Sequence, residues 1–201
     1  MNQMVRKTTT QEIINHWVMA ISFFLLAITG FAFLFQLKQL NALFGNFNVM
    51  RFLHNWGGLV FTASVFYSMS SYLKEAITFT ADDIEWIKKA GGYLSRGKVE
   101  IPPQGLLNTG QKLFYLAFLF FTFLIIVSGF VIWILGGAIK PDLLAHVIHN
   151  VSFDFLVFAI PAHIYLGSLA NPGTFRIMVY GTVPLAWARK RHGKWVKEQG
   201  F

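Results

Sequence analysis

Cysteine is absent from the 201 residues of this chain. Its absence excludes disulfides, iron–sulfur clusters held by cysteine, and the CxxCH attachment of c-type haem. Charged residues are also few: they make up 13% of the chain, against 55% hydrophobic and 17% aromatic residues, with 22 phenylalanines. A chain so poor in charge and so rich in apolar residues is typical of a membrane protein rather than a soluble one.

The apolar residues gather in four stretches that reach about the 20 residues needed to span a bilayer. We expect these helices over residues 16–36, 52–73, 111–136 and 143–170. The glycine-rich residues 136–141 form the turn between the last two helices. The sequence therefore predicts an all-α membrane protein, a four-transmembrane-helix bundle that forms a single domain over residues 1–201.

Two polar segments accompany the helices. In the segment 74–110, Thr80 and Asp83 form a capping-box pattern ahead of a short helix, which we expect on the membrane surface. Gly91 and Gly92 would end that helix. The segment 171–201 is a basic tail.

The basic residues indicate how the chain is oriented. The net charge is +8, but lysine and arginine lie beside apolar runs, which indicates flanks of membrane spans and excludes a nucleic-acid partner. With four spans, the N-terminus, residues 74–112 and the tail share one side. That side holds all 17 lysines and arginines except Lys38, Arg51 and Lys140. Both termini are therefore expected in the cytoplasm, and the chain in the bacterial inner membrane as a multi-pass protein.

Histidines lie within the apolar stretches, where an ionisable side chain is costly and is a candidate for function. His149 and His163 are fourteen residues apart, on nearly the same helix face and about 21 Å apart along the axis. With alternating spans, His54 lies at the outer level of His149 and His16 at the inner level of His163. The sequence predicts two haems, each held by two imidazoles, with Gly57, Gly58, Gly30 and Gly129 giving room for the porphyrins.

Other interpretations stay open at this point. His146 could replace His149 as the outer ligand, and a single histidine near an interface is often only a tolerated polar residue. His192, in the tail, is expected to be solvated. Asp154 is read first as a packing residue that faces the bundle and second as a contact near the haems or a proton step.

The ordered motifs resemble the gamma subunit of membrane-bound respiratory formate dehydrogenase, a di-haem cytochrome b of four helices. The resemblance covers most of the chain. It comprises His16-Trp17, the R-x-L-H pattern of Arg51 to His54, N-x-G-Q-K at Asn108 to Lys112, and Ile148-His149 followed by His163-Ile164-Tyr165. It continues in the tail with Gly181, Val183, Trp187-Ala188, Lys190, His192 and Trp195.

This resemblance implies that His54 with His149, and His16 with His163, ligate two haem b groups, and it favours His149 over His146. It also implies a quinone site beside the inner haem, with Asn108, Gly110, Gln111 and His163. From the residues alone, Asn108 is a helix N-cap. Two departures from the family are Asn55, where proline is frequent, and Asp154, where an apolar or small residue is expected.

The function implied is transmembrane electron transfer in an oxidoreductase complex. Electrons pass from an outer iron–sulfur (beta) subunit through both haems to menaquinone or ubiquinone near the cytoplasm. Formate is oxidised in a molybdenum- or tungsten-containing alpha subunit, not in this chain. The other partners are membrane lipid and, for the whole complex, a higher oligomer. Alternatives are the same cytochrome serving a hydrogenase or sulfur-compound oxidoreductase, a proton or ion transporter with a histidine relay, and a structural anchor.

Overall fold

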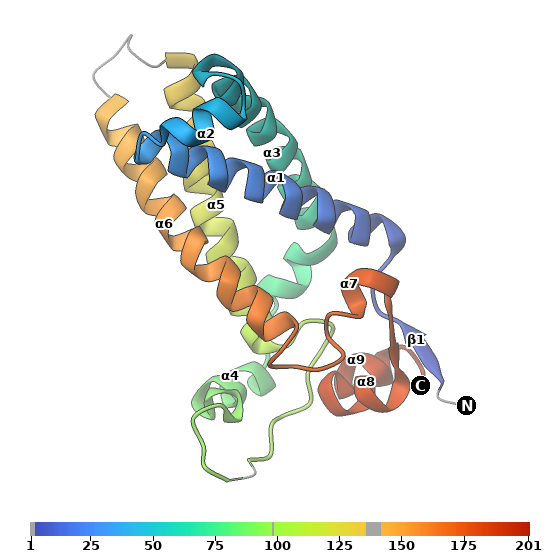
Figure 1. Cartoon of the computed structure of the whole chain (residues 1–201). Helices are drawn as coiled ribbons and strands as arrows, with labels where there is room; N and C mark the ends of the chain where they lie inside the picture. The colour runs from blue at the N-terminus through green and yellow to red at the C-terminus, as the bar shows by residue number, and fades with distance from the viewer. Residues whose placement is uncertain (1–2, 98, 136–141) are drawn as a thin grey trace. The chain divides into compact units, whose positions relative to one another are not determined.

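The fold was obtained as a computed structural model, which describes residues 3–97, 99–135 and 142–201 (Figure 1). Its four long helices are α1 (Thr10–Leu34), α3 (Phe47–Ile77), α5 (Thr109–Leu135) and α6 (Asp142–Gly167). The short helical elements are α2 (Lys38–Leu43), α4 (Ala81–Lys88), the 3-10 turn η1 (Ala90–Gly92), α7 (Ile177–Tyr180), α8 (Leu185–Arg191) and α9 (Gly193–Glu198). Strands β1 (Met4–Arg6) and β2 (Thr182–Pro184) pair antiparallel.

The long helices α1 and α3 begin earlier than the apolar pattern indicates, because polar residues cap them. The Thr9 amide donates to the Glu12 carboxylate at 2.7 Å, and the Glu12 amide donates back to the Thr9 hydroxyl. Asn46 caps α3 by accepting from the amide of Val49 at 3.0 Å. The turn expected at 136–141, which includes Lys140, lies outside the described residues.

Within the part of the chain that the structure describes, three helices are long and apolar enough to cross a membrane: Thr10–Leu34, Thr109–Leu135 and Leu143–Gly167. The chain is thus a mostly helical, multi-pass membrane protein. Helix α3 has the length to span but a more polar composition, because it carries serines and ends near Lys74 and Glu75. Its place as a fourth span stays a prediction, as does the single domain over residues 1–201.

The chain forms two compact units. The bundle unit comprises Ile14–Met69 and Phe118–Ile164, and the polar unit comprises Met1–Ile13, Ser70–Ala117 and Tyr165–Phe201.

In the bundle unit, neighbouring helices run antiparallel. Along α1 and α3, Thr29 lies beside His54, and Asn15 beside Ser64, so the numbering rises in one helix as it falls in the other. The same order relates α3 to α5, α5 to α6, and α1 to α6, through the contacts Trp56–Trp133, Phe61–Phe118, Gly129–His149, Phe121–Phe155, Phe31–Phe153 and His16–His163. The four segments therefore form an up-down-up-down bundle.

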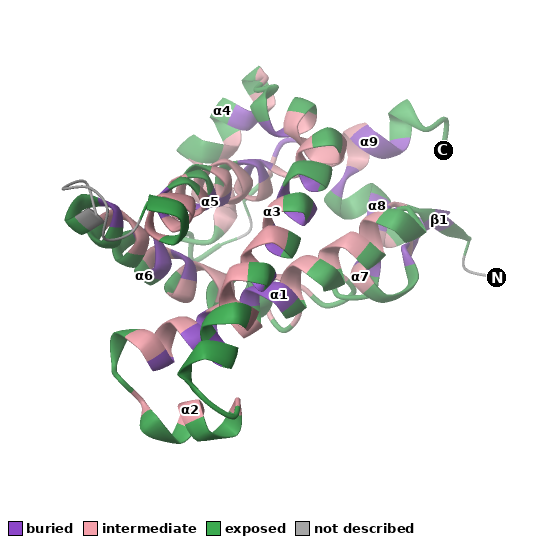
Figure 2. Cartoon of the chain, turned by 90° about the horizontal axis from the view of Figure 1, so that it is seen from above, coloured by how far each residue is buried: buried purple, intermediate pink, exposed green. Residues whose placement is uncertain are grey.

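The burial pattern of the bundle unit suits a lipid surrounding. Large apolar side chains lie on the outside, and Phe158 and Ile21 are 80% and 67% exposed. Small polar residues lie inside: Ser22, Thr29, Ser64, Thr122, Ser128 and Ser152 are buried. Buried positions line the sides of the helices that face one another, and exposed positions face outward (Figure 2). In a membrane, small and hydroxyl side chains at helix contacts allow close packing and hydrogen bonds, as seen here.

The polar unit has a small hydrophobic core that joins the two ends of the chain. Its members are Val5, Ile177, Val183, Leu185, Ala188, Trp195 and Val196. Gly181 has a φ of +70°, and a Cβ on it would lie 2.5 Å from the Thr8 carbonyl oxygen. The amides of Lys7 and Thr8 donate to the Gly181 carbonyl, so only glycine allows this approach. The tail is therefore folded onto the N-terminal strand.

Candidate functional site

Two of the histidines in the bundle unit face each other from α3 and α6. The ring centres of His54 and His149 are 6.4 Å apart, and their planes are tilted by 57°. Both side chains are half-buried. The structure thus brings together the two residues that the sequence paired at the outer level.

A neighbouring helix fixes the orientation of each of these rings. Thr29 Oγ1 donates to the Leu25 carbonyl at 2.7 Å, so it meets His54 Nδ1, 2.7 Å away, as an acceptor. His149 Nδ1 lies 3.1 Å from the Ile125 carbonyl oxygen, which can only accept. In both rings Nδ1 therefore carries the proton and Nε2 offers a lone pair. This is the arrangement that metal-ligating histidines use, with the second nitrogen donating to a neighbour.

A cavity of about 660 Å³ opens beside these two histidines. Its wall is mainly apolar and aromatic, with His54 and His149 among its few polar groups. The other lining residues include Phe23, Leu26, Gly58, Phe61, Ile125, Gly129, Phe130, Trp133 and Leu156.

The glycines singled out in the sequence differ in what surrounds them. Gly58 and Gly129 line the cavity. A Cβ on Gly129 would lie 3.1 Å from Cε1 of His149, so this glycine lets the ring lie against α5. Gly57 instead packs against Leu25, and a Cβ on Gly30 would make ordinary contacts with Phe153 at 3.7 Å and with Cε1 of His54 at 3.9 Å. Gly58 and Gly129 thus border the cavity, whereas Gly57 and Gly30 allow helix packing.

The second pair lies in the same unit, on α1 and α6. The ring centres of His16 and His163 are also 6.4 Å apart, with planes tilted by 43°. Nδ1 of His16 is buried and has no hydrogen-bond partner among the described residues. A buried polar atom without a partner is costly, so a ligand or ordered water at this nitrogen would stabilise the site.

The repeated 6.4 Å separation suits an ion held between two imidazoles. Two collinear metal–nitrogen bonds of about 2 Å take up about 4 Å of the separation between the ring centres. The remainder is roughly 1.2 Å per ring, which is the distance from the centre of an imidazole to one of its ring atoms. The free Nε2 lone pairs of His54 and His149 and the apolar cavity beside them fit a haem iron held by two histidines. Among the described residues no cluster of three or more His, Asp or Glu forms another type of metal site.

His146 and Asp154 do not lie inside the bundle. His146 is exposed on α6, whereas His149, less than one turn further, faces His54. Asp154 is exposed as well. The first interpretation of Asp154, a packing residue that faces the bundle, is therefore wrong: it lies on the opposite side of α6 from the buried Ser152 and Leu156.

The expected quinone residues Asn108, Gly110 and Gln111 lie at the start of α5, in the polar unit, whereas His163 belongs to the bundle unit. The Gln111 amide donates to Asn108 Oδ1 at 2.8 Å, and the Asn108 amide donates to Gln111 Oε1 at 2.9 Å. This reciprocal pair is a capping box, so the interpretation of Asn108 as an N-cap is confirmed. Each oxygen accepts one bond in the cap, and the side-chain NH2 groups remain as donors for a ligand.

A buried ion pair fixes the start of α5 to α4. Lys112 Nζ lies 3.1 Å from Asp83 Oδ2, and both side chains are only 6% exposed. Thr109 Oγ1 also donates to Asp83 at 2.7 Å, and Thr80 closes the expected capping box with Asp83. Burial alone would raise the pKa of the Asp83 carboxyl, but hydrogen bonds from Thr109, Thr80 and Lys112 hold it below its ordinary value. Asp83 is thus charged at neutral pH.

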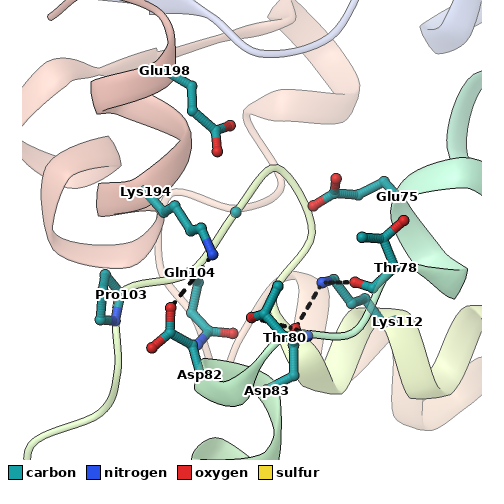
Figure 3. A pocket seen from close by; sticks show the side chains of 11 residues that line it. Glu75, Thr78, Thr80, Asp82, Asp83, Pro103, Gln104, Lys112, Lys194 and Glu198 are labelled. Atoms are coloured by element: carbon teal, nitrogen blue, oxygen red, sulfur yellow. Dashed lines mark hydrogen bonds and ion pairs between the residues drawn. The ribbon is translucent and has the colours of Figure 1, made fainter.

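A polar pocket of about 460 Å³ lies beside this ion pair (Figure 3). Its wall carries four carboxylates, Glu75, Asp82, Asp83 and Glu198, and two lysines. Lys112 donates inward to Asp83 and to the Thr78 carbonyl, whereas Lys194 reaches Asp82 at 3.4 Å from α9. The polar unit thus presents a net acidic hollow next to the start of α5.

His192 was expected to be solvated, and this expectation is wrong. The side chain is 2% exposed, and Nδ1 donates to the Gly105 carbonyl at 2.8 Å. Burial, and then the charge of Lys7, lower its pKa to about 3. The neutral ring helps to hold residues 104–106, where the Gln104 carbonyl accepts from two amides of α9 and the Leu106 carbonyl accepts from Lys7.

Sequence reasoning missed Thr29, Ser128, Gln104 and Asp83 as supporting residues. Thr29 and Ser128 stand inside apolar runs, and an inward-facing hydroxyl in a span was the available signal. Asp83 was noted only as a cap residue, and its pairing with Lys112 spans 29 positions that no local pattern connects.

Comparison with known proteins gives a consistent result. The family model for prokaryotic cytochrome b561 matches residues 7–181. The cytochrome b556(fdo) subunit of formate dehydrogenase from Escherichia coli K12 is 33% identical over 195 residues, which cover 94% of this chain and 90% of that protein. The nitrate-inducible cytochrome b556(Fdn) subunit from the same organism is 26% identical over 205 residues, 98% of this chain and 92% of that protein.

A third relative is the formate dehydrogenase cytochrome b556 subunit of Haemophilus influenzae, 27% identical over 191 residues, 92% of this chain and 79% of that protein. The resemblance inferred from the ordered motifs is therefore confirmed. The family implies haem b as cofactor and electron transport as the general role. The long match to its model shows that this chain belongs to the prokaryotic cytochrome b561 family.

Proposed function

We propose that this chain is the di-haem b subunit of a formate dehydrogenase, which carries electrons across the membrane to a quinone. The observation that carries the proposal is the presence of two facing histidine pairs with the same 6.4 Å separation. His54 and His149 would hold the outer haem, and His16 and His163 the inner haem. Each haem, when bound, supplies a reversible one-electron centre with no open coordination position.

The geometry of α6 sets the span of the electron path. His149 and His163 lie on this one helix, fourteen residues and about 21 Å apart. Thr29 and Ile125 hold the outer imidazoles in the tautomer that leaves Nε2 for iron. Moving one electron inward against the membrane potential stores about 2.3 kcal/mol per 100 mV. The chain conserves energy in this way without pumping protons.

The orientation of the chain follows from charge. With α3 as the fourth span, both termini and the acidic and basic side chains of the polar unit lie in the cytoplasm, and the protein sits in the bacterial inner membrane. All lysines and arginines except Lys38, Arg51 and Lys140 then lie on the cytoplasmic side. His16 and His163 are thereby at the cytoplasmic level and His54 and His149 at the outer level.

The quinone binds at the cytoplasmic level, at Asn108, Gly110 and Gln111 of the polar unit. The capping box supports a role for the amides, because it uses their oxygens as acceptors and leaves their NH2 groups to donate to a quinone carbonyl oxygen. A Cβ on Gly110 would lie 3.0 Å from the Trp86 ring, so the backbone packs tightly here. Protons for the reduced quinone come from the cytoplasm. Menaquinone and ubiquinone both present the required carbonyls.

The relatives are named as subunits of formate dehydrogenases, and this favours formate dehydrogenase over a hydrogenase or sulfur-compound oxidoreductase. The partners are an iron–sulfur (beta) subunit, which delivers electrons at the outer haem, and a molybdenum- or tungsten-containing alpha subunit, which oxidises formate. This chain is the quinone-reactive part of the oxidoreductase complex.

The test is a haem count and a reduced-minus-oxidised spectrum of the purified chain and of single alanine variants. The wild type should show a b-type α band and two haems per chain. His54→Ala and His149→Ala should each lose the same haem, and His16→Ala and His163→Ala the other. His146→Ala is the matched control and should keep both. A colourless protein, or loss of the outer haem in His146→Ala but not in His149→Ala, would refute the assignment.

A further inference from the structure

Glu75 is the carboxylate at which the polar pocket meets the segment that leads into α5. It stands in the last turn of α3, and its side chain points into the pocket (Figure 3). Its Oε1 accepts a hydrogen bond from the Leu107 amide at 3.3 Å, and a Cβ on Gly105 would lie 2.7 Å from the same oxygen. Leu107 directly precedes Asn108, so Glu75 connects the pocket with the residue proposed to bind the quinone.

The other three carboxylates on the pocket wall are engaged elsewhere. Asp83 accepts from Thr109, Thr80 and Lys112, which hold it in the charged form. Asp82 lies 3.4 Å from Lys194 of α9. Glu198 belongs to α9, is exposed and shows that the pocket reaches the solvent. Glu75 is therefore the pocket carboxylate best placed to exchange a proton with the quinone segment.

The cation that faces Glu75 is Lys7, near the N-terminal strand. Burial lowers the pKa of Lys7 to about 8, and the charges of Glu75 and then Glu12 act in the opposite direction. Lys7 Nζ donates to the Leu106 carbonyl at 2.5 Å. Lys112, on the same pocket wall, is directed at α4 instead. Lys7 thus favours the ionised form of Glu75, which can accept a proton from the pocket.

We propose that Glu75 passes protons from the polar pocket to the quinone at Asn108. The proposal rests on the proposed function and names its proton donor. Reduction of a quinone to a quinol takes up two electrons, which the haem path supplies, and two protons. For each proton, the O–H bond of the Glu75 carboxyl breaks and an O–H bond forms on a quinone oxygen, through one bridging water. The carboxylate then takes a new proton from water in the pocket.

Glu75→Gln tests this role in membranes that contain the whole complex. Glutamine keeps the size of the side chain and an acceptor for the Leu107 amide but does not titrate. Reduced haem is mixed in a stopped-flow instrument with short-chain menaquinone or ubiquinone, each added separately. The rate of haem oxidation should fall about 100-fold, the lower end of what a positioned acid contributes. The haem spectrum and the quinone concentration for half-maximal rate should stay unchanged.

Rescue by a small acid separates proton transfer from a structural role. Acetic acid in the buffer should restore the rate of Glu75→Gln and should not accelerate the wild type. Glu198→Gln, the same substitution on the α9 side of the pocket, is the matched control and should keep the wild-type rate. A wild-type rate in Glu75→Gln, or a slow rate that acetic acid does not restore, would overturn the proposal alone. A wild type whose haem neither quinone oxidises would refute the proposed function, and this role of Glu75 with it.

Discussion

The imidazole rings of His54 and His149 face each other at 6.4 Å, and each is held from behind by a hydrogen bond to a different helix. His54 is held by Thr29 of α1, and His149 by the Ile125 carbonyl, with Ser128 Oγ 3.2 Å from the same nitrogen. The outer pair therefore depends on all four long helices. A ligand between the rings would in turn tie these helices together.

The Thr29 hydroxyl is the first part of this arrangement to test. Thr29→Val keeps the shape of the side chain but removes the acceptor for His54 Nδ1. Loss of such a supporting partner typically costs about 10–100-fold in affinity for the metal group. We expect the outer haem to be lost on dilution or to titrate at a changed potential, with the inner haem unaffected. Ser22→Ala, a buried hydroxyl two turns earlier on α1, is the control, and an equal effect in both variants would contradict the role of Thr29.

Gly129 provides a steric test of the same ring. Gly129→Ala places a methyl group 3.1 Å from Cε1 of His149, so the ring must shift by some tenths of an ångström. We expect a changed α band or partial loss of the outer haem, measured by spectrum and haem count. The matched control is Gly30→Ala, whose nearest neighbour would be 3.7 Å away and which should keep the wild-type spectrum. Identical spectra for all three proteins would show that Gly129 does not support the ring.

The amide of Asn108 has two separable parts, its capping oxygen and its NH2 donor. Asn108→Asp keeps the cap on the Gln111 amide and removes the donor, whereas Asn108→Ala removes both. If the donor binds quinone, Asn108→Asp should raise the quinol concentration needed for half-maximal haem reduction, with helix stability preserved. Asn108→Ala should in addition lower stability by about 0.5–2 kcal/mol, the usual cost of a lost N-cap. If haem in Asn108→Asp is reduced at the same quinol concentration as in the wild type, Asn108 acts only as a helix cap and does not bind quinone.

The buried pair of Asp83 and Lys112 should be sensitive to the loss of one partner. Asp83→Ala leaves an ammonium group buried without its counter-ion, which typically costs about 3–5 kcal/mol. The double variant Asp83→Ala/Lys112→Met removes both charges and should recover much of that loss. Denaturant unfolding, followed by tryptophan fluorescence, measures the cycle. Additive losses in the double variant would mean that the two groups do not interact.

Costly residues in apolar segments are the feature from which the structure is most predictable. Four histidines stand out against their surroundings, and the structure brings them together in the two expected pairs. The capping box of Thr80 and Asp83 was also readable, because its two members are three residues apart. The role of the four histidines as haem ligands stays a prediction, because facing rings alone do not show that a haem is bound.

The polar unit was much less predictable, for a physical reason. Strand β1 pairs with β2 across about 180 residues, and each strand has only three residues, too few for a periodic pattern. His192 stands among basic residues and reads as exposed, yet its nearest partner is the Gly105 carbonyl, 87 positions away. Asp154 was placed on the wrong face because a charged residue in a span was assumed to need the interior of its own bundle.

The burial of His192 predicts how the polar unit responds to acid. Burial, followed by the charge of Lys7, lowers the pKa of this imidazole from 6.5 to about 3, so the folded chain keeps it neutral where the unfolded chain takes up a proton. The stability contributed by the neutral ring is complete above pH 6.5 and is lost progressively as the pH falls toward 3. From pH 6.5 to 5 the loss is roughly 2 kcal/mol, at about 1.36 kcal/mol per pH unit.

His192→Asn should weaken this dependence, because asparagine can donate to the Gly105 carbonyl but does not titrate. The melting temperature, followed by the fluorescence of tryptophans such as Trp187, whose ring centre is 5.6 Å from that of His192, should fall less between pH 7 and 5 in the variant than in the wild type. His146→Asn, at an exposed histidine, is the control and should keep the wild-type slope. Parallel curves for His192→Asn and the wild type would mean that the buried ring takes up its proton in the folded chain, and the tail would then be less tightly packed against residues 104–106 than the hydrogen bonds indicate.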